Sequence, residues 1–544
     1  MPMPPITSVC AATGMFENTD PVLLCGNNLS IDELILVARG GHSLAISADP
    51  ELRDRIDRAY KSIQQAVINK ETIYGVTTGF GGMANILISG DEIDALQDNM
   101  LWFLKAGTGG RLPTVDVRAA MVLRANSHLR GTSGPRLELI ERILEFVNAG
   151  VTSHVPDLGS IGASGDSVPL SYVTGALIGH DAGYQVDFEG QTMDATKALQ
   201  TLGLPRMRLQ PKEALAMLNG TSVCTAIAAD CIHEARELVE LALHAHALML
   251  QGLRATDLSF DPFIHQHKPH AGQVWSVTCL RNLLSDSGLI RGADGKNHNP
   301  EEGLVQDRYS VRCLPQYIGP IVDSIVEAAA QIEVEMNSAT DNPLIDPDTG
   351  NIFYGGNFLA QYTAVAMNRL RYSLGLVAKH LDVQIAQLVS PEFNNGLAPS
   401  LVELTVLDFL GNSLADRFLT HAEQFNQNIN SQAFGSTNLA RQSIDLLRRH
   451  VAMSLLFGIQ AVDLRTYAIE GHYDARCLLS PAQIPIYTAL YEVTGTTPSS
   501  ARPWLWDDNQ WQLDCDVAAV CANIAENGSI ARASTLNFPR RPVQ

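Results

Sequence analysis

The chain has few of the features that mark secreted or membrane proteins. Its nine cysteines are an odd number, are widely scattered and form no Cys-x-x-Cys pair. This usage predicts reduced thiols in a cytosolic protein rather than a disulfide framework. No run of about 18 apolar residues is free of charges, so we expect no transmembrane helix. The first residues contain neither a basic segment nor an apolar core, so we expect no signal peptide.

Basic residues are scarce relative to acidic ones. The chain has 38 Lys and Arg against 58 Asp and Glu, and its formal net charge is −20. This balance argues against a nucleic-acid partner and against an anionic membrane surface. An anionic group on a substrate would therefore need a specific local cation.

Apolar sequence is abundant, since 46% of the 544 residues are hydrophobic. Such a chain can bury a large core and is long enough for two or three packed subdomains. Apolar periodicity predicts helices at 30–39, 50–69, 91–105, 114–129 and 135–149, a glycine-rich loop at 71–90 and a hairpin at 185–194. Longer helical segments are predicted at 212–253, 304–337, 357–390, 405–430 and 436–468.

These patterns predict a mostly α protein built on a long antiparallel helix bundle. We expect an N-terminal helical and loop domain over 1–211, the central bundle over 212–470 and a helical and loop tail over 471–544. The apolar content of the long helices is high for helices that face water, so we expect partner subunits to cover some faces.

Ala163-Ser164-Gly165 is a tripeptide of small residues that precedes a predicted helix, with Asp166 as its cap and Pro169 in its first turn. A tight bend there would let the Gly165 nitrogen attack the Ala163 carbonyl. Loss of water, and of the Ser164 hydroxyl, would leave a conjugated methylidene-imidazolone ring, an electrophile that no ordinary side chain supplies. Taken alone, the tripeptide is better explained as a Gly/Ser turn at a helix entry.

Five other segments accompany this tripeptide in a fixed order. They are Tyr74-Gly75-Val76-Thr77-Thr78-Gly79-Phe80-Gly81, Asn219-Gly220-Thr221-Ser222, Gln306-Asp307-Arg308-Tyr309-Ser310-Val311-Arg312, Thr340-Asp341-Asn342-Pro343 and Glu423-Gln424-Phe425-Asn426-Gln427-Asn428. Together the six segments resemble the aromatic amino acid ammonia-lyases, from about Leu29 to the tail. The resemblance is closest to phenylalanine ammonia-lyases of the bacterial, cyanobacterial type.

The resemblance implies deamination of L-phenylalanine to trans-cinnamate and ammonia. It also implies a built-in cofactor, the ring 4-methylidene-imidazole-5-one (MIO) formed from Ala163, Ser164 and Gly165, with no external cofactor and no metal. Breaking the β C–H bond requires an electron sink, and such a ring supplies it by bonding the substrate amine. The resemblance further implies a homotetramer in the cytoplasm whose subunits share active sites.

Tyr74 resembles the family's base for the β-proton. A free phenol has a pKa of about 10, so nearby positive charge or donors must stabilise its phenolate. The glycine-rich loop around it fits a mobile lid. Without the other segments, a loop aromatic that docks on the core explains Tyr74 equally well.

Arg312 resembles the family's carboxylate anchor, because a guanidinium fork grips a carboxylate in bidentate fashion. Tyr309 and Gln306 precede it at intervals of three, so we expect all three on one helix face. A lone arginine is more often part of a surface ion pair.

Asn219 and Asn342 resemble residues that hold the ring carbonyl and the substrate, although either alone would more often be a helix cap. Donors aimed at the ring oxygen would polarise it. A polar stripe follows helical spacing at Glu423, Asn426, Gln427 and Asn430. Alone it would be a solvated face, but its apolar flanks favour a buried seam. Glu423 and Gln427 are site candidates near the substrate amine, and the resemblance adds Phe358 to the substrate-binding set.

Selectivity is expected at Phe103-Leu104, which in the family faces the substrate ring. Tyrosine-preferring members carry His at the first position and histidine-preferring members a polar pair. Phe-Leu would leave a phenol hydroxyl without a partner, which favours phenylalanine. Without the resemblance, both would be read as ordinary core residues of a helix.

Three other groups of residues have ordinary explanations. His265, His267 and His270 have loop-like spacing with no cysteine or carboxylate cluster, so structural histidines are expected rather than metal ligands. Residues 79–82 lack the context of a phosphate-binding loop. The tryptophans at 504, 506 and 511 suggest packing or an interface.

The chain departs from the family in a block after Ser400. There the family carries an additional helix-length segment with a Lys-Gly-Leu-Gln stretch, whereas here Pro399-Ser400 runs almost directly to Phe409, and no lysine occurs between His380 and Ala440. Part of the pocket wall is therefore missing, or another segment replaces it. Three rivals of the lyase remain: an aminomutase using the same ring, a tyrosine or histidine ammonia-lyase, and an inactive helical scaffold.

A second departure yields a prediction. Ser167 stands where the family usually has leucine, close to the ring, and a serine there loosens the packing or makes the pocket more polar. We expect phenylalanine to bind more weakly to this protein than to its Ser167→Leu variant. Steady-state kinetics on both proteins measures the difference, and equal KM and kcat values would contradict it.

Overall fold

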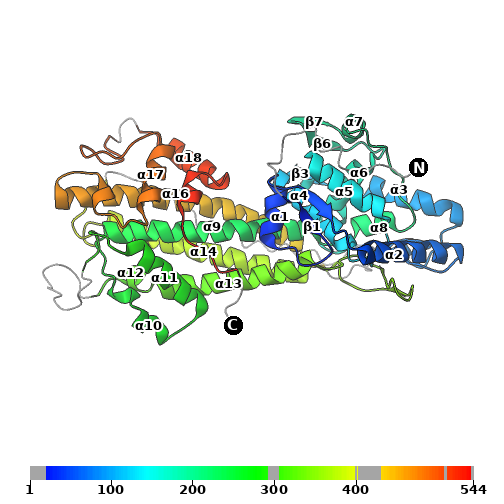
Figure 1. Ribbon diagram of the computed structural model, residues 1–544, viewed down its shortest axis with the longest axis horizontal. Coiled ribbons are helices and arrows are strands. Elements are labelled where there is room, and N and C mark those ends of the chain that lie inside the picture. Colours follow the sequence, from blue (N-terminus) through cyan, green and yellow to red (C-terminus); the bar gives the residue numbers. More distant parts are fainter. Residues whose placement is uncertain (1–19, 292–305, 399–400, 402–429, 508–510, 541–544) are drawn as a thin grey trace. The chain divides into compact units, whose positions relative to one another are not determined.

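The computed structural model describes residues 20–291, 306–398, 401, 430–507 and 511–540 (Figure 1). By internal contacts the chain divides into two compact units. The first comprises residues 1–233, 329–368 and 415–440, and the second comprises 234–328, 369–414 and 441–544. The three-part division expected from the sequence stays a prediction. Helices dominate the described residues and the strands are short, which confirms the mostly α class.

The helices of the first unit follow the predicted periodicity closely up to residue 178, and a further helix over Ala195–Thr201 was not predicted. Ser30 and Glu33 form a reciprocal capping box at the start of α1. Asp49 caps α2, which has proline in its first turn. The helices are α1 (Ile31–Ala38), α2 (Pro50–Ile68), α3 (Ile93–Phe103), α4 (Thr114–His128), α5 (Leu137–Ala149), α6 (Ser167–Ile178) and α7 (Ala195–Thr201).

Short strands join these helices in four small sheets. The predicted hairpin is present, because β6 (Gln185–Phe188) pairs antiparallel with β7 (Gln191–Asp194), and β4 (Thr152–Ser153) extends this sheet. The other pairs are β1 (Val22–Leu24) with β2 (Leu44–Ile46), β3 (Thr108–Arg111) with β5 (Pro156–Leu158), and β8 (Leu344–Ile345) with β9 (Ile352–Phe353). The glycine-rich loop contains turns, an isolated β-bridge between Thr78 and Leu87, and short 3-10 helices at Gly81–Met83 and Gly90–Glu92.

The single helix predicted over 212–253 is wrong. The chain forms α8 (Glu213–Leu218) and α9 (Ser222–Gly252), separated by a turn at 219–221. Asn219 has extended dihedral angles and Gly220 has φ +155°, so the helix cannot continue through them. Asn219 therefore lies in a turn between two helices. Apolar periodicity alone does not predict this turn.

The helix predicted over 304–337 is also interrupted. The structure has a short α12 (Tyr309–Arg312) and then α13 (Leu314–Met336), and Gln306 precedes both. The expectation that Gln306, Tyr309 and Arg312 share one helix face is therefore wrong for Gln306. The segment predicted over 405–430 lies outside the described residues, apart from Asn430.

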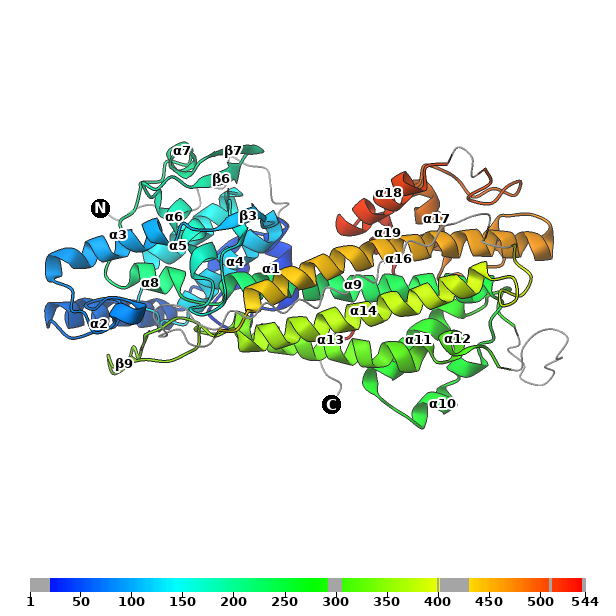
Figure 2. The ribbon, with the colours of Figure 1, turned by 180° about the vertical axis from the view of Figure 1, so that it is seen from behind.

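Long helices form the core of the second unit. They are α9, α13, α14 (Gln361–Val389) and α16 (Ala433–Glu470), and the unit boundaries fall within them. In this unit they run side by side in both views (Figures 1 and 2). Gly458 of α16 packs on Leu248 of α9, where an added Cβ would lie 2.7 Å from the leucine Cβ. His246 of α9 is 2.8 Å from Gln384 of α14.

Shorter elements complete the second unit. They are α10 (Pro262–Gln266), α11 (Ala271–Leu284), α12, α17 (Ile484–Val493), α18 (Leu513–Ala525), α19 (Ser529–Ala533) and 3-10 helices at Leu258–Phe260 and Ala475–Cys477. Trp504 is fully buried, and its ring lies 5.7 Å from that of Trp511. The tryptophan cluster therefore serves packing, as expected.

The sequence predicted reduced cysteines and no transmembrane helix, and the fold can be compared with both predictions. Every cysteine in the described ranges is a free thiol. Among the residues that the structure describes, no helix combines the length and apolarity needed to cross a bilayer. His265 lies 3.1 Å from the Ser259 carbonyl and His267 lies 2.7 Å from that of Phe263, which fits the structural role expected for them.

A buried histidine links the pH to the stability of the second unit. His244 in α9 lies 3.0 Å from the Gln483 side chain and 3.2 Å from the Ser534 hydroxyl. Burial lowers the pKa of His244 from 6.5 to about 4. The unfolded chain therefore binds a proton that the folded chain resists, and stability falls as the pH drops from about 6.5 toward 4.

We expect the wild-type protein to lose about 2 kcal/mol more stability between pH 7.5 and pH 5 than a His244→Gln variant does, since each pKa unit is worth about 1.4 kcal/mol. Urea unfolding at the two pH values measures this difference. His270→Gln, which alters an exposed ring, is the control. Equal pH dependence in wild type and His244→Gln would contradict the prediction.

Candidate active site

The tripeptide loop of the first unit is held against the turn between α8 and α9. Gly165 pairs with Gly220 in an isolated β-bridge, and the Asp166 N–H donates to the Gly220 carbonyl over 2.7 Å. Gly165 has φ +69°, and a Cβ added there would lie 2.2 Å from the Gly220 oxygen. Only glycine fits this position, because both the dihedral angle and the space exclude a side chain.

The carbonyl oxygen of Ser164 accepts bonds from two side chains. The Asn219 Nδ2 donates over 2.9 Å and the Ser167 hydroxyl over 3.1 Å. Asn219 is only 5% exposed, and its Oδ1 has no partner among the described residues. The structure thus brings the predicted Asn219 to the tripeptide, in the orientation that polarises a carbonyl.

Asp166 joins this loop to α9 rather than capping its own helix as expected. It occupies the N-cap position of α6 but makes no side-chain bond to that helix. Its Oδ2 accepts the N–H groups of Val223, at 2.9 Å, and Cys224, at 2.8 Å, in the first turn of α9. Burial raises the pKa of Asp166 to about 6, against the pull of these donors. The carboxylate therefore satisfies the start of α9 and fixes the end of the tripeptide loop.

Arg124 of α4 lies behind the turn and was not predicted from the sequence. Its Nη1 donates to the Asn219 carbonyl and its Nη2 to the Ser127 hydroxyl, both over 3.0 Å. A Cβ added to Gly220 would lie 2.0 Å from Nη1, so the guanidinium packs directly against this glycine. Burial lowers the pKa of Arg124 to about 10, which leaves it charged at neutral pH.

Lys212 is a second buried cation that the sequence analysis missed. It is fully buried in an ion pair with Asp341, whose other oxygen accepts the Ser133 hydroxyl over 2.7 Å. Arg124 interrupts an apolar segment, and a lone charge in such a segment is the signal that would have singled it out. Lys212 stands between Pro211 and Glu213 and gives no such signal.

The segment that follows the predicted polar stripe binds the same loop. Both the N–H and the hydroxyl of Ser431 donate to the Gly162 carbonyl, over 3.1 and 3.2 Å. Asn430 accepts a bond from Gln432 over 2.6 Å. Glu423, Asn426 and Gln427 lie outside the described residues.

Tyr74 lies half-buried in the glycine-rich loop. Its hydroxyl oxygen accepts the Gly81 N–H over 3.1 Å. A donor to this oxygen is what a phenolate base requires. The donor comes from the same loop, so the loop positions its own tyrosine.

The expected selectivity pair lies at the end of α3. Phe103 is 57% exposed and is not a core residue of this chain. Leu104 is half-buried, and its carbonyl accepts the Ser171 hydroxyl over 3.1 Å. Since Ser171 belongs to α6, the helix that begins beside the tripeptide also holds this pair.

Asn342 and Phe358 lie near each other in sequence but apart from the tripeptide contacts. The Asn342 Oδ1 accepts the Gly355 N–H over 2.7 Å, which ties it to the segment before α14. Phe358 is half-buried in that segment. No direct bond to Ser164 is present for either residue in the described structure.

The remaining candidates belong to the second unit. The Arg312 guanidinium carbon lies 4.6 Å from the centre of the Tyr309 ring. The Nε of Arg312 is buried and has no hydrogen-bond partner among the described residues. Tyr309 and Gln306 are exposed. Arg312 thus has a donor that no described residue uses, and it fits the expectation that an anionic group of a substrate needs a local cation.

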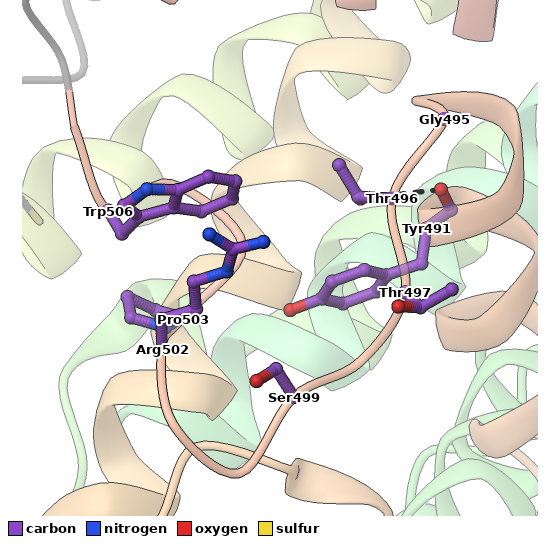
Figure 3. Close-up of a pocket in the computed structure, with 8 residues that line it drawn as sticks. All are labelled: Tyr491, Gly495, Thr496, Thr497, Ser499, Arg502, Pro503 and Trp506. Carbon is purple, nitrogen blue, oxygen red and sulfur yellow. Dashed lines mark hydrogen bonds between the residues drawn. The ribbon is translucent and has the colours of Figure 1, made fainter.

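A cavity of about 280 Å³ in the second unit contains none of the predicted residues (Figure 3). The Arg502 guanidinium carbon lies 3.5 Å from the centre of the Trp506 ring at its edge. Hydroxyl groups of Thr497 and Ser499 also line it. The cavity is therefore separate from every residue assigned to the tripeptide site.

Comparison with known proteins defines the class of protein. Residues 29–480 match the family model described as aromatic amino acid lyase, and the chain belongs to this family. It is 54% identical over 539 residues to the phenylalanine ammonia-lyase of Nostoc punctiforme, with 95% of each chain covered. It is 46% identical over 533 residues to the aromatic ammonia-lyase of Loktanella atrilutea, covering 94% of this chain and 97% of the relative.

A solved structure of similar fold is the tyrosine aminomutase from Streptomyces globisporus. The TM-score is 0.81 at 26% sequence identity, and the match covers 96% of this chain and 100% of that chain. The fold is thus shared by enzymes with different outcomes for the amine.

The MIO ring is characteristic of the family, and the residues here fit its formation. The tripeptide consists of small residues, and Gly165 is held in a left-handed bend that no other residue fits. The Asn219 amide already donates to the oxygen that the ring would keep.

We expect Gly165→Ala to destabilise the protein by several kcal/mol, because the added Cβ collides with the Gly220 backbone in addition to the backbone strain. Gly190→Ala is the matched control, since Gly190 has φ +73° but open space around its Cβ position. Backbone strain alone costs about 1–2 kcal/mol. Denaturant midpoints measure both variants, and similar losses would show that the contact with Gly220 has little energetic weight.

Proposed function

We propose that this protein deaminates L-phenylalanine to trans-cinnamate and ammonia. The observation that carries the proposal is the tripeptide loop, bonded to Asn219 and paired with Gly220, in a chain 54% identical to a phenylalanine ammonia-lyase. The missing helix-length block after Ser400 lies at residues outside those described, and its effect stays a prediction.

The MIO ring, formed from Ala163, Ser164 and Gly165, would supply an electrophile for the substrate amine. Asn219 donates to the Ser164 oxygen and so stabilises charge that develops there. Tyr74 removes the β-proton, and the Gly81 N–H, which donates to its hydroxyl oxygen, positions its side chain.

Arg312 binds the substrate carboxylate. Its buried Nε, which has no partner among the described residues, is available for the bidentate grip that a carboxylate accepts. Tyr309 packs against this guanidinium and orients it. Roles for Gln306, Asn342, Phe358, Glu423 and Gln427 stay predictions from the family resemblance.

Phe103 and Leu104 favour phenylalanine over tyrosine. Neither side chain can bond a phenol hydroxyl, which would be left unsatisfied in the pocket. The exposed face of Phe103 is available to a substrate ring. An aminomutase is the second candidate, because the tyrosine aminomutase from Streptomyces globisporus shares the fold.

We also propose a cytoplasmic homotetramer with shared active sites. Helix α14 exposes large side chains, with Tyr372 71% and Tyr362 68% exposed. A helix face of this kind supports coverage by a partner subunit. The free thiols of the described chain support the cytoplasmic location.

Product analysis tests the proposed reaction. Purified protein is incubated with phenylalanine, tyrosine and histidine together, and the products are separated. We expect cinnamate to dominate, and we expect Tyr74→Phe to reduce its formation by about 100-fold or more, as loss of a general base does. Light scattering on the same preparation measures the native mass.

Other products would change the assignment. β-Phenylalanine would identify an aminomutase, and coumarate as the main product would contradict the selectivity expected from Phe103-Leu104. An intact mass without loss of two waters, together with no product, would indicate the inactive scaffold.

A further inference from the structure

Ser167 occupies a position where the family usually has leucine, and it makes a specific contact. It is the first residue of α6 and is half-buried. Its hydroxyl donates to the Ser164 carbonyl oxygen over 3.1 Å. The same oxygen accepts the Asn219 amide over 2.9 Å. A leucine at this position could donate no bond.

The Ser164 oxygen is the one that ring formation leaves in place. In the first step the Gly165 nitrogen bonds to the Ala163 carbonyl carbon, and the Ala163 oxygen leaves as water with the N–H protons of Gly165 and Ser164. In the second step Ser164 loses its Oγ with a proton and its Cα hydrogen as water. No oxidant or reductant is needed, and the Ser164 carbonyl becomes the carbonyl of the ring.

Negative charge moves onto this carbonyl oxygen when a nucleophile adds to the conjugated methylidene carbon. Donors placed in advance lower the barrier, because they need no reorganisation as the charge develops. The Asn219 donor is expected from the family. The Ser167 donor is a property of this chain's own sequence.

We propose that Ser167 is a catalytic residue of this protein, which shares with Asn219 the stabilisation of charge on the ring oxygen. The inference rests on the proposed function, because it requires that the ring forms. In this role Ser167 donates a hydrogen bond to the ring oxygen, which a residue that only packs there would not do. The lost leucine side chain is thereby replaced by a second donor.

An ordinary structural bond is the competing explanation. Serine and threonine in the first turns of helices often bond backbone carbonyls three or four residues earlier. Thr174 makes such a bond in the same helix, to the Leu170 carbonyl over 2.8 Å, and it is buried. Thr174→Val therefore removes a comparable bond that does not reach the tripeptide.

The test compares wild type, Ser167→Ala, Ser167→Thr and Thr174→Val as full-length purified chains. Alanine is chosen over leucine because leucine would also change the packing of the pocket. Intact mass first establishes that each protein has lost two waters. Cyanide, a small nucleophile, is then added, and adduct formation is followed by mass over time.

We expect Ser167→Ala to form the adduct about 3- to 10-fold more slowly than wild type, as loss of one neutral hydrogen bond predicts. The kcat for phenylalanine should fall by a similar factor. Ser167→Thr, which keeps the hydroxyl, should recover the wild-type rate within about 2-fold, since the same type of bond is retained. Thr174→Val should react like wild type.

Several results would overturn the proposal. Adduct formation by Ser167→Ala at the wild-type rate would show that the donor carries no catalytic weight. Equal slowing in Thr174→Val would show that the bond acts through helix stability. Loss of waters in wild type but not in Ser167→Ala would place Ser167 in ring formation instead. An unmodified mass in wild type would overturn the proposed function itself.

Discussion

The pairing of Gly165 with Gly220 is the contact on which the candidate site depends. It places the tripeptide against the turn between α8 and α9. A Cβ on Gly165 would collide with the Gly220 backbone, and a Cβ on Gly220 would collide with Arg124 and Thr340. Two further contacts join the same loop and turn. Asn219 reaches the Ser164 oxygen from the turn, and Asp166 reaches the first turn of α9 from the loop. One backbone approach therefore fixes the geometry of a donor and an electrophile precursor together.

Buried charged side chains support the close contact between Gly165 and Gly220. Arg124 bonds the Asn219 carbonyl and fills the space beside Gly220. Lys212 is paired with Asp341 in the interior of the same unit. Burying charged groups is costly unless they are paired and bonded, so such groups persist where they determine one geometry rather than where they add stability. Here the geometry is that of the turn between α8 and α9. This turn has few hydrogen bonds of its own and is held by neighbouring side chains.

The site also shows how a polar contact can replace an apolar one. Ser167, where the family resemblance leads us to expect a leucine, bonds the carbonyl of Ser164. The loss of an apolar side chain at this position affects the affinity for the substrate. The gain of a hydrogen-bond donor affects the stabilisation of charge that develops on the carbonyl oxygen. Arg312, the residue proposed to bind the substrate carboxylate, belongs to the second unit of the chain.

The sequence by itself determined the class of the fold, and it singled out the tripeptide and Asn219, which the structure brings together. Helical patterns in the sequence predicted α1 to α6, and the segment 185–194 was predicted as a hairpin. Composition showed the need for a local cation, and the tripeptide together with five other segments indicated the chemistry through the family resemblance. Periodicity could not show that the helix over 212–253 is broken at Asn219, because the residues around the break are apolar on both sides.

Only the tertiary structure decided what lies around the tripeptide. Arg124, which is far from it in sequence, became its support because α4 passes behind Gly220. Asp166 proved to serve α9 instead of its own helix, since its carboxylate accepts the N–H groups of Val223 and Cys224. A sequence records which donors and acceptors exist. Which of them meet is set by the packing of elements distant in the chain, where unpaired buried groups are too costly to remain.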